Sequence, residues 1–345
     1  MKITTMGIDL AKNVFQLHGV DEHGHSVLRR SLKRSQMQVY FARLEPCLIG
    51  REACGGAHYW ARILTEFGHT VRLMAPQFVK PYVKSQKNDA ADAEAICEAV
   101  ARPNMRFVAI KTPEQQALLA LHRARAGFVK ARTAQANQMR GLLGEFGLVI
   151  PPGMAHLQQG LPVLLEDAEN GLPATMRALL WRLLEQLKAL DRQAAELEAE
   201  ILAWHKQNET SRRLAEIPGI GPLGASALVA SIGEVRHFAN GRQLAAWLGL
   251  VPRQHSSGGK ALLLGISKRG DSYLRMLLIH GARAVIRAFE RKATPPEGWL
   301  KRLLARRHKN VAAVALANKM ARIAWAVLAH GDRFRPDYPA AMAAR

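Results

Sequence analysis

Four carboxylates stand where the sequence predicts the ends of strands and the start of a helix. Asp9 follows the apolar stretch "TTMGI", and Glu52 ends the apolar stretch "CLIGRE". Asp89 and Asp92 lie three residues apart in "NDAADAEA", at a predicted helix start, so both project from one face of that helix. Because strand ends and a crossing helix can meet at one edge of a sheet, the four carboxylates predict a site for one or two Mg²⁺ ions. Such a site promotes phosphoryl transfer. Taken alone, Asp89 and Asp92 also fit ordinary acids that match the dipole of a helix N-terminus, and Asp9 fits a turn residue.

A serine- and glycine-rich loop, "HSSGGK" at 255–260, is the second candidate site. The hydroxyl of Ser256 or Ser257 can attack a phosphodiester, and the two glycines that follow let the backbone approach DNA closely. His255 is a candidate for proton transfer, or else a polar loop residue. Cations around the loop can neutralise phosphate as charge develops, and we expect them to bind nucleic acid: Arg253, Lys260, Lys268, Arg269 and Arg275. The same composition also fits a flexible loop without chemistry.

The elements that must position the carboxylates are predicted from hydrophobic periodicity. Three strands in a meander are followed by alternating helices and strands, which indicates an α/β fold: a mixed sheet covered by helices, as in ribonuclease H-like proteins. The predicted strands are 3–8, 13–20, 25–33, 47–53 and 70–76, and the predicted helices are 35–45, 57–67 and 89–101.

A long helical region follows at 113–147, and after a proline- and glycine-rich break a heptad seam begins. Its spacing alternates four and three without a fault, which is typical of a coiled coil. The seam can pair with another helix of the same chain or with a second chain, and we favour the second chain. The seam residues are Met176, Leu180, Leu183, Leu187, Leu190, Ala194, Leu197, Ile201 and Trp204.

The stretch "IPGIGPLGASALVASIG" at 217–233 places a short glycine turn between two helices. This pattern resembles a helix-hairpin-helix motif, in which backbone N–H groups at a helix start hold a phosphate. Gly219 and Gly221 are the candidate nucleic-acid contacts of this turn. A purely structural helix turn is the alternative.

The charge of the chain indicates a polyanionic partner. Its 49 Lys and Arg against 28 Asp and Glu give a net charge of +21 and a pI near 10.5, which favours a nucleic-acid-binding protein. The three cysteines form no zinc-binding pattern and fit a reducing compartment. The sequence shows no signal peptide and no apolar run of about 18 residues. We therefore expect a soluble protein of the cytoplasm, without a membrane partner.

Five motifs occur together in an order that resembles a known family: "GIDLAK", "REACGG", "KNDAADAEA", "IPGIGPLGA" and "VPRQHSSGGKALLLGISKRGDSYLR". They resemble the DEDD-type transposases of insertion-sequence family one-hundred-and-ten, which is related to the pilin-inversion recombinases. The resemblance covers nearly the whole chain. It implies a RuvC-like DEDD catalytic domain at 1–112, a helical and coiled-coil region at 113–212, and a C-terminal helical transposase domain at 213–345 that carries a catalytic serine.

The resemblance also implies roles for individual residues. The family's four metal-binding acids fall on Asp9, Glu52, Asp89 and Asp92, and its nucleophilic serine falls on Ser257, with the neighbouring Ser256 as the alternative. The family acts on donor and target DNA with Mg²⁺, through a covalent phosphoserine intermediate, and is guided by a non-coding bridge RNA. A homo-oligomer, dimer or tetramer, would form through the coiled coil.

Two other functions compete with this interpretation. In a metal-only nuclease of the junction-resolving type, the carboxylates would do all the chemistry, and the serine loop would merely bind phosphate. In a non-catalytic nucleic-acid scaffold, four acids within a cationic surface would weaken binding unless they held metal. The serine loop argues against the first alternative and the carboxylates argue against the second.

Overall fold

The computed structural model describes residues 2–10, 12–84, 88–294 and 296–335, so the last ten residues of the predicted C-terminal domain lie outside it. The chain forms two compact units. The first comprises residues 1–113 with 232–237, and the second comprises residues 114–231 with 238–345. The boundary expected at residue 212 therefore lies inside the second unit.

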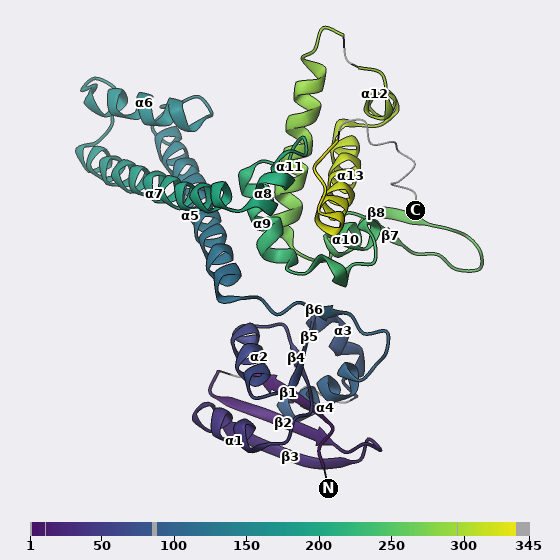
Figure 1. Ribbon diagram of the computed structural model, residues 1–345. Coiled ribbons are helices and arrows are strands. Elements are labelled where there is room, and N and C mark those ends of the chain that lie inside the picture. The colour runs from purple at the N-terminus through teal and green to yellow at the C-terminus, as the bar shows by residue number, and fades with distance from the viewer. Residues whose placement is uncertain (1, 11, 85–87, 295, 336–345) are drawn as a thin grey trace. The chain divides into compact units, whose positions relative to one another are not determined.

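A six-stranded mixed sheet forms the centre of the first unit, in the order β3-β2-β1-β4-β5-β6 (Figure 1). The antiparallel meander β1–β2–β3 joins the parallel strands β4 and β5 through β1, and β6 pairs antiparallel with β5. The α/β class and the mixed sheet that the sequence predicts are thus confirmed. The strands are β1 (Thr5–Leu10), β2 (Val14–Val20), β3 (Ser26–Lys33), β4 (Leu48–Glu52), β5 (Thr70–Met74) and β6 (Phe107–Val108).

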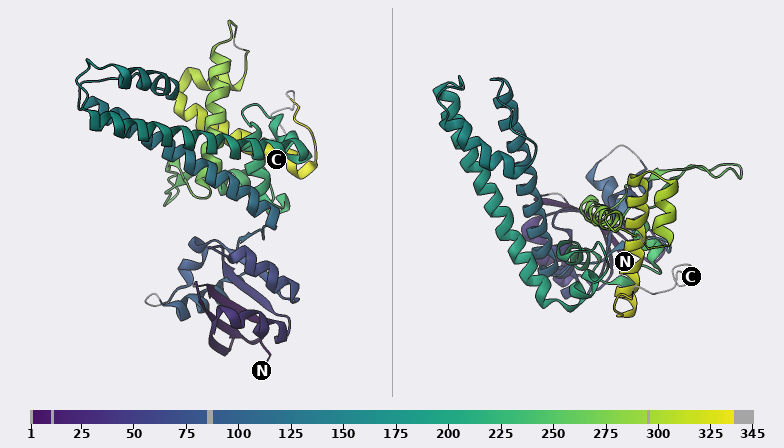
Figure 2. Two further views of the ribbon diagram at one scale, coloured as in Figure 1. Left: turned by 90° about the vertical axis from the view of Figure 1, so that its left-hand side faces the viewer. Right: turned by 90° about the horizontal axis from the view of Figure 1, so that it is seen from above.

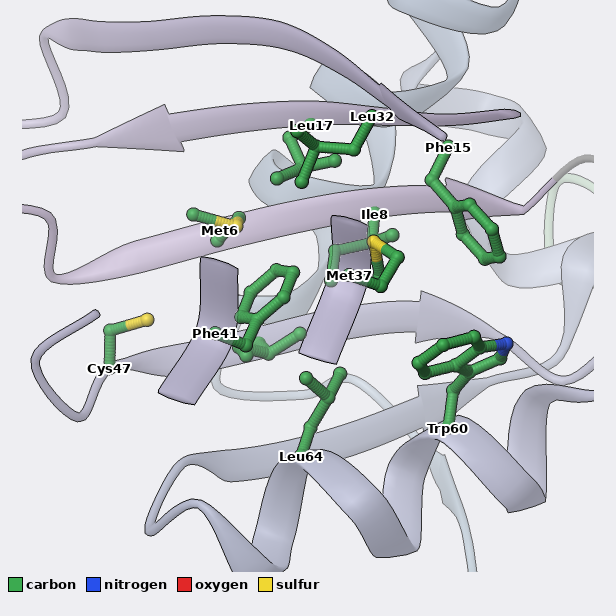
Figure 3. Close-up of a cluster of buried hydrophobic side chains, with 11 residues drawn as sticks. Met6, Ile8, Phe15, Leu17, Leu32, Met37, Phe41, Cys47, Trp60 and Leu64 are labelled. Atoms are coloured by element: carbon green, nitrogen blue, oxygen red, sulfur yellow. The ribbon is translucent and has the colours of Figure 1, made fainter. Parts of the chain in front are cut away.

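Helices cover both faces of this sheet because its strands bury side chains on both sides. Helices α1 (Met37–Arg43) and α2 (Ala57–Glu66) close one face over a core that includes Ile8, Phe15 and Trp60 (Figure 3). Helix α4 (Asp89–Val100) packs on the other face. The first unit also contains the short helices α3 (Pro76–Val79), η1 (Arg34–Gln36), η2 (Lys80–Tyr82) and η3 (Val235–His237).

Two long helices of the second unit, α5 (Pro113–Gly144) and α7 (Ala174–Gln207), run side by side and carry α6 (Met154–Glu166) at one end (Figure 2). Alternate residues of the heptad seam predicted on α7 are buried within the chain, and the others are partly buried. Leu180 and Leu187 pack with Met139 and Leu143 of α5, and Ile201 packs with Leu118 and Leu119 near the start of α5. The structure thus shows the pairing within one chain that we had not favoured.

The rest of the second unit is a helical bundle with one small hairpin. By length and composition alone, helix α13 is long and apolar enough to cross a membrane, although no such segment was expected from the sequence. Its buried residues face α10 and α11, as in the core helix of a globular bundle. The elements are α8 (Glu209–Ala215), α9 (Pro222–Ile232), α10 (Gly241–Trp247), β7 (Pro252–Gln254), β8 (Leu263–Ile266), α11 (Ser272–Glu290), α12 (Trp299–Arg306) and α13 (Lys309–His330).

Candidate functional site

Two predicted acids stand at the carboxyl edge of the sheet. In the parallel pair β1–β4, Ile8 lies opposite Arg51, so Asp9 and Glu52 are each one residue further along neighbouring strands. Gly7 and Gly50 face α4, because a Cβ on Gly7 would meet the backbone of Ala93 and Cys97, and one on Gly50 would meet Val100. Side chains alternate along a strand, so Asp9 and Glu52 project from the same face as these glycines.

The first turn of α4 brings the other two acids to this face. Asn88 caps the helix, and its side-chain oxygen accepts a hydrogen bond from the Ala91 backbone N–H at 2.8 Å. Asp89 and Asp92 occupy the first turn that this cap fixes. The absence of side chains at Gly7 and Gly50 permits the close approach of α4 to β1 and β4 that the arrangement requires.

Asp9, Asp89 and Asp92 form a cluster in which one carboxylate oxygen from each residue lies within 4.8 Å of the others. The structure thus brings together three of the four predicted acids, while Glu52 stands outside this group at the same sheet edge. Burial raises the pKa of Asp9, and the negative charges of Asp89 and Asp92 raise it further. Asp9 and Asp92 are half-buried and Asp89 is exposed. Carboxylates that repel one another in this way are a donor set suited to a divalent cation, which would remove the repulsion.

Arg51, which sequence reasoning did not single out, directly precedes Glu52 on β4 and projects from the opposite face of the sheet. Its side chain is 0% exposed, and its three guanidinium nitrogens have no hydrogen-bond partner among the described residues. Burial lowers the pKa of Arg51 to about 9, while the charge of Asp9 favours its charged form. An arginine inside an otherwise apolar strand was the available signal in the sequence. Its positive charge partly offsets the negative charge of the cluster.

The serine loop forms the tip of the β7–β8 hairpin, which extends from the helices of the second unit (Figure 1). Gly258 and Gly259 both have positive φ angles, of 54° and 77°, and the Lys260 backbone N–H donates to the Ser257 carbonyl at 3.0 Å. These features indicate a two-residue turn of type I′, for which glycine is the suitable residue at both central positions. Ser257 is the residue immediately before the turn and is exposed.

The two serine hydroxyls have different surroundings. The oxygen of Ser256 accepts a hydrogen bond from the Leu262 backbone N–H at 3.2 Å and another from the Gln254 amide at 3.0 Å. The Ser257 hydroxyl makes no hydrogen bond within the described part of the chain. Ser256 therefore stabilises the hairpin through its hydrogen bonds. The hydroxyl of Ser257, at the tip of the hairpin, has no such role.

The cations near the hairpin fall into two groups. Arg253, Lys260, Lys268 and Arg269 are exposed, as expected of residues that contact a polyanion. Arg275 is half-buried, and its guanidinium donates to the carbonyls of Leu248 at 3.1 Å and Arg269 at 3.3 Å. It therefore ties the segment before α11 to the end of α10.

The glycine turn between α8 and α9 packs tightly on its first glycine. Gly219 has a φ of 90°, and a Cβ there would meet the Gly281 carbonyl at 3.0 Å and Met320 at 2.8 Å. This packing against α11 and α13 accounts for the glycine and favours the structural alternative at this position. Gly221 is exposed, with nothing near the position of a Cβ, so a phosphate contact there stays a prediction.

Comparison with known proteins gives two family matches along the chain. A DEDD transposase family of the IS110 type matches residues 6–147, and a family described as "Transposase IS116/IS110/IS902 family" matches residues 211–295. A "Probable family 20 transposase" of Pseudomonas aeruginosa is 55% identical over 337 residues, which is 97% of this chain and 100% of that protein. The chain belongs to the IS110 family of DEDD transposases.

Two further relatives of this transposase carry the names of the insertion sequences they serve. The transposase for IS1111A of Coxiella burnetii is 47% identical and covers 96% of this chain and 92% of its own length. The transposase for IS1328 of Yersinia enterocolitica is 45% identical and covers 96% and 98%. An insertion-sequence transposase acts on DNA, and its DEDD domain implies the use of a divalent metal. The clustered carboxylates of this transposase fit that requirement.

Proposed function

We propose that this transposase cuts and rejoins DNA strands through a covalent bond between Ser257 and a DNA phosphate. The proposal rests on the Ser257 hydroxyl, which makes no hydrogen bond among the described residues. The Ser256 oxygen, by contrast, accepts two hydrogen bonds within the hairpin. Attack of the Ser257 oxygen on phosphorus would break the bond to one deoxyribose oxygen and release a 3′ or 5′ hydroxyl end. Attack of a DNA hydroxyl on the phosphoserine would later reverse this step, so no external energy source is needed.

The carboxylates have the second part in this proposal. Asp9, Asp89 and Asp92, with Glu52 at the same sheet edge, would hold one or two Mg²⁺ ions. A bound divalent cation would polarise the scissile phosphate and stabilise the oxygen that leaves. Asp89 and Asp92 repel Asp9 electrostatically. A bound cation would remove this repulsion, and this favours cation binding by the carboxylates.

The choice of DNA site is assigned in this proposal to a non-coding bridge RNA that pairs with donor and target DNA. Two basic segments support it: residues 102–140 carry eight Lys or Arg and one acid, and residues 251–322 carry sixteen and three. Between them, residues 163–205 carry eight acids and four bases. Two basic segments suit two nucleic-acid partners. The reaction would take place in the bacterial cytosol or nucleoid, by a dimer or tetramer.

Trapping the covalent complex tests the serine. DNA that cannot rejoin should leave a nucleotide adduct on the wild-type protein after denaturation, and mass spectrometry should place it on Ser257. Ser257→Ala should bind DNA with an affinity within about 1 kcal/mol of wild type, the worth of one hydrogen bond, yet give no adduct and no cut. Ser256→Ala should keep measurable cleavage. An adduct on Ser256 would move the nucleophile by one residue, and cleavage without any adduct would favour a metal-only nuclease.

A further inference from the structure

A cavity of about 650 Å³ lies at the edge of the sheet where β2 begins and β3 ends. Its polar and cationic wall comes from the strand ends, with Asn13 before β2 and Lys33 and Arg34 at the end of β3. The Arg34 backbone N–H donates to the Asn13 carbonyl at 2.9 Å, which joins these two segments. The opposite wall is Tyr59 and Trp60 from the first turns of α2. No acidic side chain occurs among the described lining residues.

The aromatic wall of the cavity consists of the buried ring of Trp60 and the exposed ring of Tyr59. Trp60 is 2% exposed and lies edge-on to Phe15 of the core, with ring centroids 5.3 Å apart (Figure 3). Its indole N–H has no acceptor among the described residues. Tyr59 contacts Trp60 edge-on at 5.3 Å but is 41% exposed, so its ring is available for stacking. Arg34 covers the Trp60 ring, with its guanidinium 5.4 Å from the ring centroid.

The cavity is close to the carboxylate cluster along the chain and along the sheet. Gln16 lies opposite Asp9 in the β1–β2 pair, and Val14 of the cavity is two residues away on β2. Two strand residues span roughly 7 Å, about the rise of two nucleotides. The segment 53–58 joins Glu52 directly to the turn of α2 that carries Tyr59. The carboxylates project from the face that α4 covers, whereas Tyr59 and Trp60 belong to α2 on the other face. A nucleic-acid strand at the carboxylates would therefore reach the cavity by passing around the carboxyl edge of the sheet.

We propose that this cavity binds one unpaired DNA nucleotide beside the scissile phosphate, with its base stacked on Tyr59 and its phosphates held by Lys33 and Arg34. Stacking on an aromatic ring needs a base that has left the duplex, and it accepts any base because every base has a π face. Asn13 and Gln38 supply amide groups for the base edge. The inference rests on the proposed function in one respect: the strand at the carboxylates is DNA.

A fluorescent base tests the cavity without any strand cleavage. Full-length protein carrying Asp9→Asn is titrated with DNA oligonucleotides in which 2-aminopurine replaces one unpaired base at successive positions. We expect quenching at one position. Adding Tyr59→Ala should abolish it and weaken binding of that oligonucleotide by about fivefold or more, whereas Tyr59→Phe should preserve both. Phe146→Ala is the matched control, because Phe146 lies outside the cavity, in the turn that follows α5, and is 39% exposed.

Removing a positive charge from the cavity tests the proposal independently of the aromatic ring. Lys33→Gln should weaken binding of the same oligonucleotide and reduce its salt dependence, while Lys80→Gln, which changes an exposed lysine outside the cavity, should not.

Equal effects of Tyr59→Ala and Phe146→Ala, or quenching that survives Tyr59→Ala, would overturn the proposal. So would Tyr59-dependent quenching by RNA of the same sequence but not by DNA. Cleavage by wild-type protein is measured separately. Its absence would refute the proposed function, and quenching would still report on the cavity.

Discussion

Asp92 and Glu94 are two acids of one helix with different surroundings. Asp92 belongs to the carboxylate cluster, whereas Glu94 lies 3.7 Å from both Arg29 and Lys84. We expect Asp92→Asn to lower metal-dependent DNA cleavage by about a hundredfold or more, because a missing ligand leaves transition-state charge uncompensated. Glu94→Gln should leave cleavage within about twofold, since surface ion pairs contribute little. Cleavage rates and calorimetric titration with Mg²⁺ measure both. Full cleavage by Asp92→Asn would remove Asp92 from the site.

His122 is a fully buried histidine that the hydrogen-bond pattern keeps neutral. One ring nitrogen lies 3.1 Å from Ser226 Oγ, which donates to the Pro222 carbonyl, and the other lies 3.0 Å from the Tyr273 hydroxyl. Ser226 can thus accept from the ring while Tyr273 donates to it. Burial, assisted by the charge of Arg125, lowers the pKa of His122 to about 4.

The unfolded chain consequently binds more protons than the native protein between about pH 6.5 and pH 4. The contribution of His122 to stability is full above about pH 6.5 and declines as pH falls through this window. From pH 7 to pH 5 we expect the free energy of unfolding to drop by about 2 kcal/mol on this account. Urea denaturation at the two pH values should show a smaller drop for His122→Gln. An identical drop in both proteins would contradict the prediction.

At the scale of elements, α5 and α7 stabilise each other through one buried seam. Leu187 is 0% exposed on this seam, while Leu179 on the same helix is 39% exposed. We expect Leu187→Ala to lower the free energy of unfolding by about 2–5 kcal/mol, because it leaves a cavity between packed helices. Leu179→Ala should change it by less than about 1 kcal/mol. Denaturant titration measures both, and a small effect of Leu187→Ala would show that the seam is not packed as described.

Many of the elements follow from the sequence, although β6, β7 and β8 were not predicted. The partners of the predicted elements do not follow from it. Period-two and period-3.6 patterns predict β1, β4 and α4 to within about two residues. The heptad pattern likewise predicts α7, yet an apolar seam contains no information about which helix will cover it. Pairing with α5 depends on Met139 and Leu143, whose positions become relevant only once the chain turns back through α6. A homo-oligomer therefore stays a prediction without the support of an exposed seam.

The carboxylate cluster could be predicted from the sequence, whereas the complete burial of Arg51 could not. Asp9, Asp89 and Asp92 stand at element ends, where the sequence pattern itself indicates a position. Arg51 lies opposite Leu73 of β5, which packs with Ala57 and Ala61 of α2, so its burial is a tertiary effect. Ordinary preferences oppose it, since charged side chains are rarely fully buried. The packing of Gly219 against Gly281 likewise joins residues far apart in the sequence.

At the scale of the whole molecule, the net charge of +21 predicts binding that weakens with salt. We expect the full-length protein to bind RNA transcribed from the non-coding DNA that flanks its gene. Affinity should fall by about a thousandfold or more between about 50 mM and about 200 mM salt, as counterions return to the phosphates. Electrophoretic mobility shift at several salt concentrations measures this. An unrelated RNA of equal length should show a similar salt slope but weaker binding, and equal affinity for both RNAs would argue against guidance.

The β7–β8 hairpin has only two strands, and three of its leucines, Leu262, Leu263 and Leu264, are 43–63% exposed. A two-stranded sheet with little buried surface opens by local fluctuation far more often than a packed helix does. Its amide hydrogens should therefore exchange with solvent orders of magnitude faster than those of the central sheet. Ordering of the hairpin by a bound substrate would slow this exchange, so the Ser257 segment would become fully organised only when the protein is loaded. If Ser257 is the nucleophile, as proposed, its hydroxyl would then be positioned for attack only in the loaded protein.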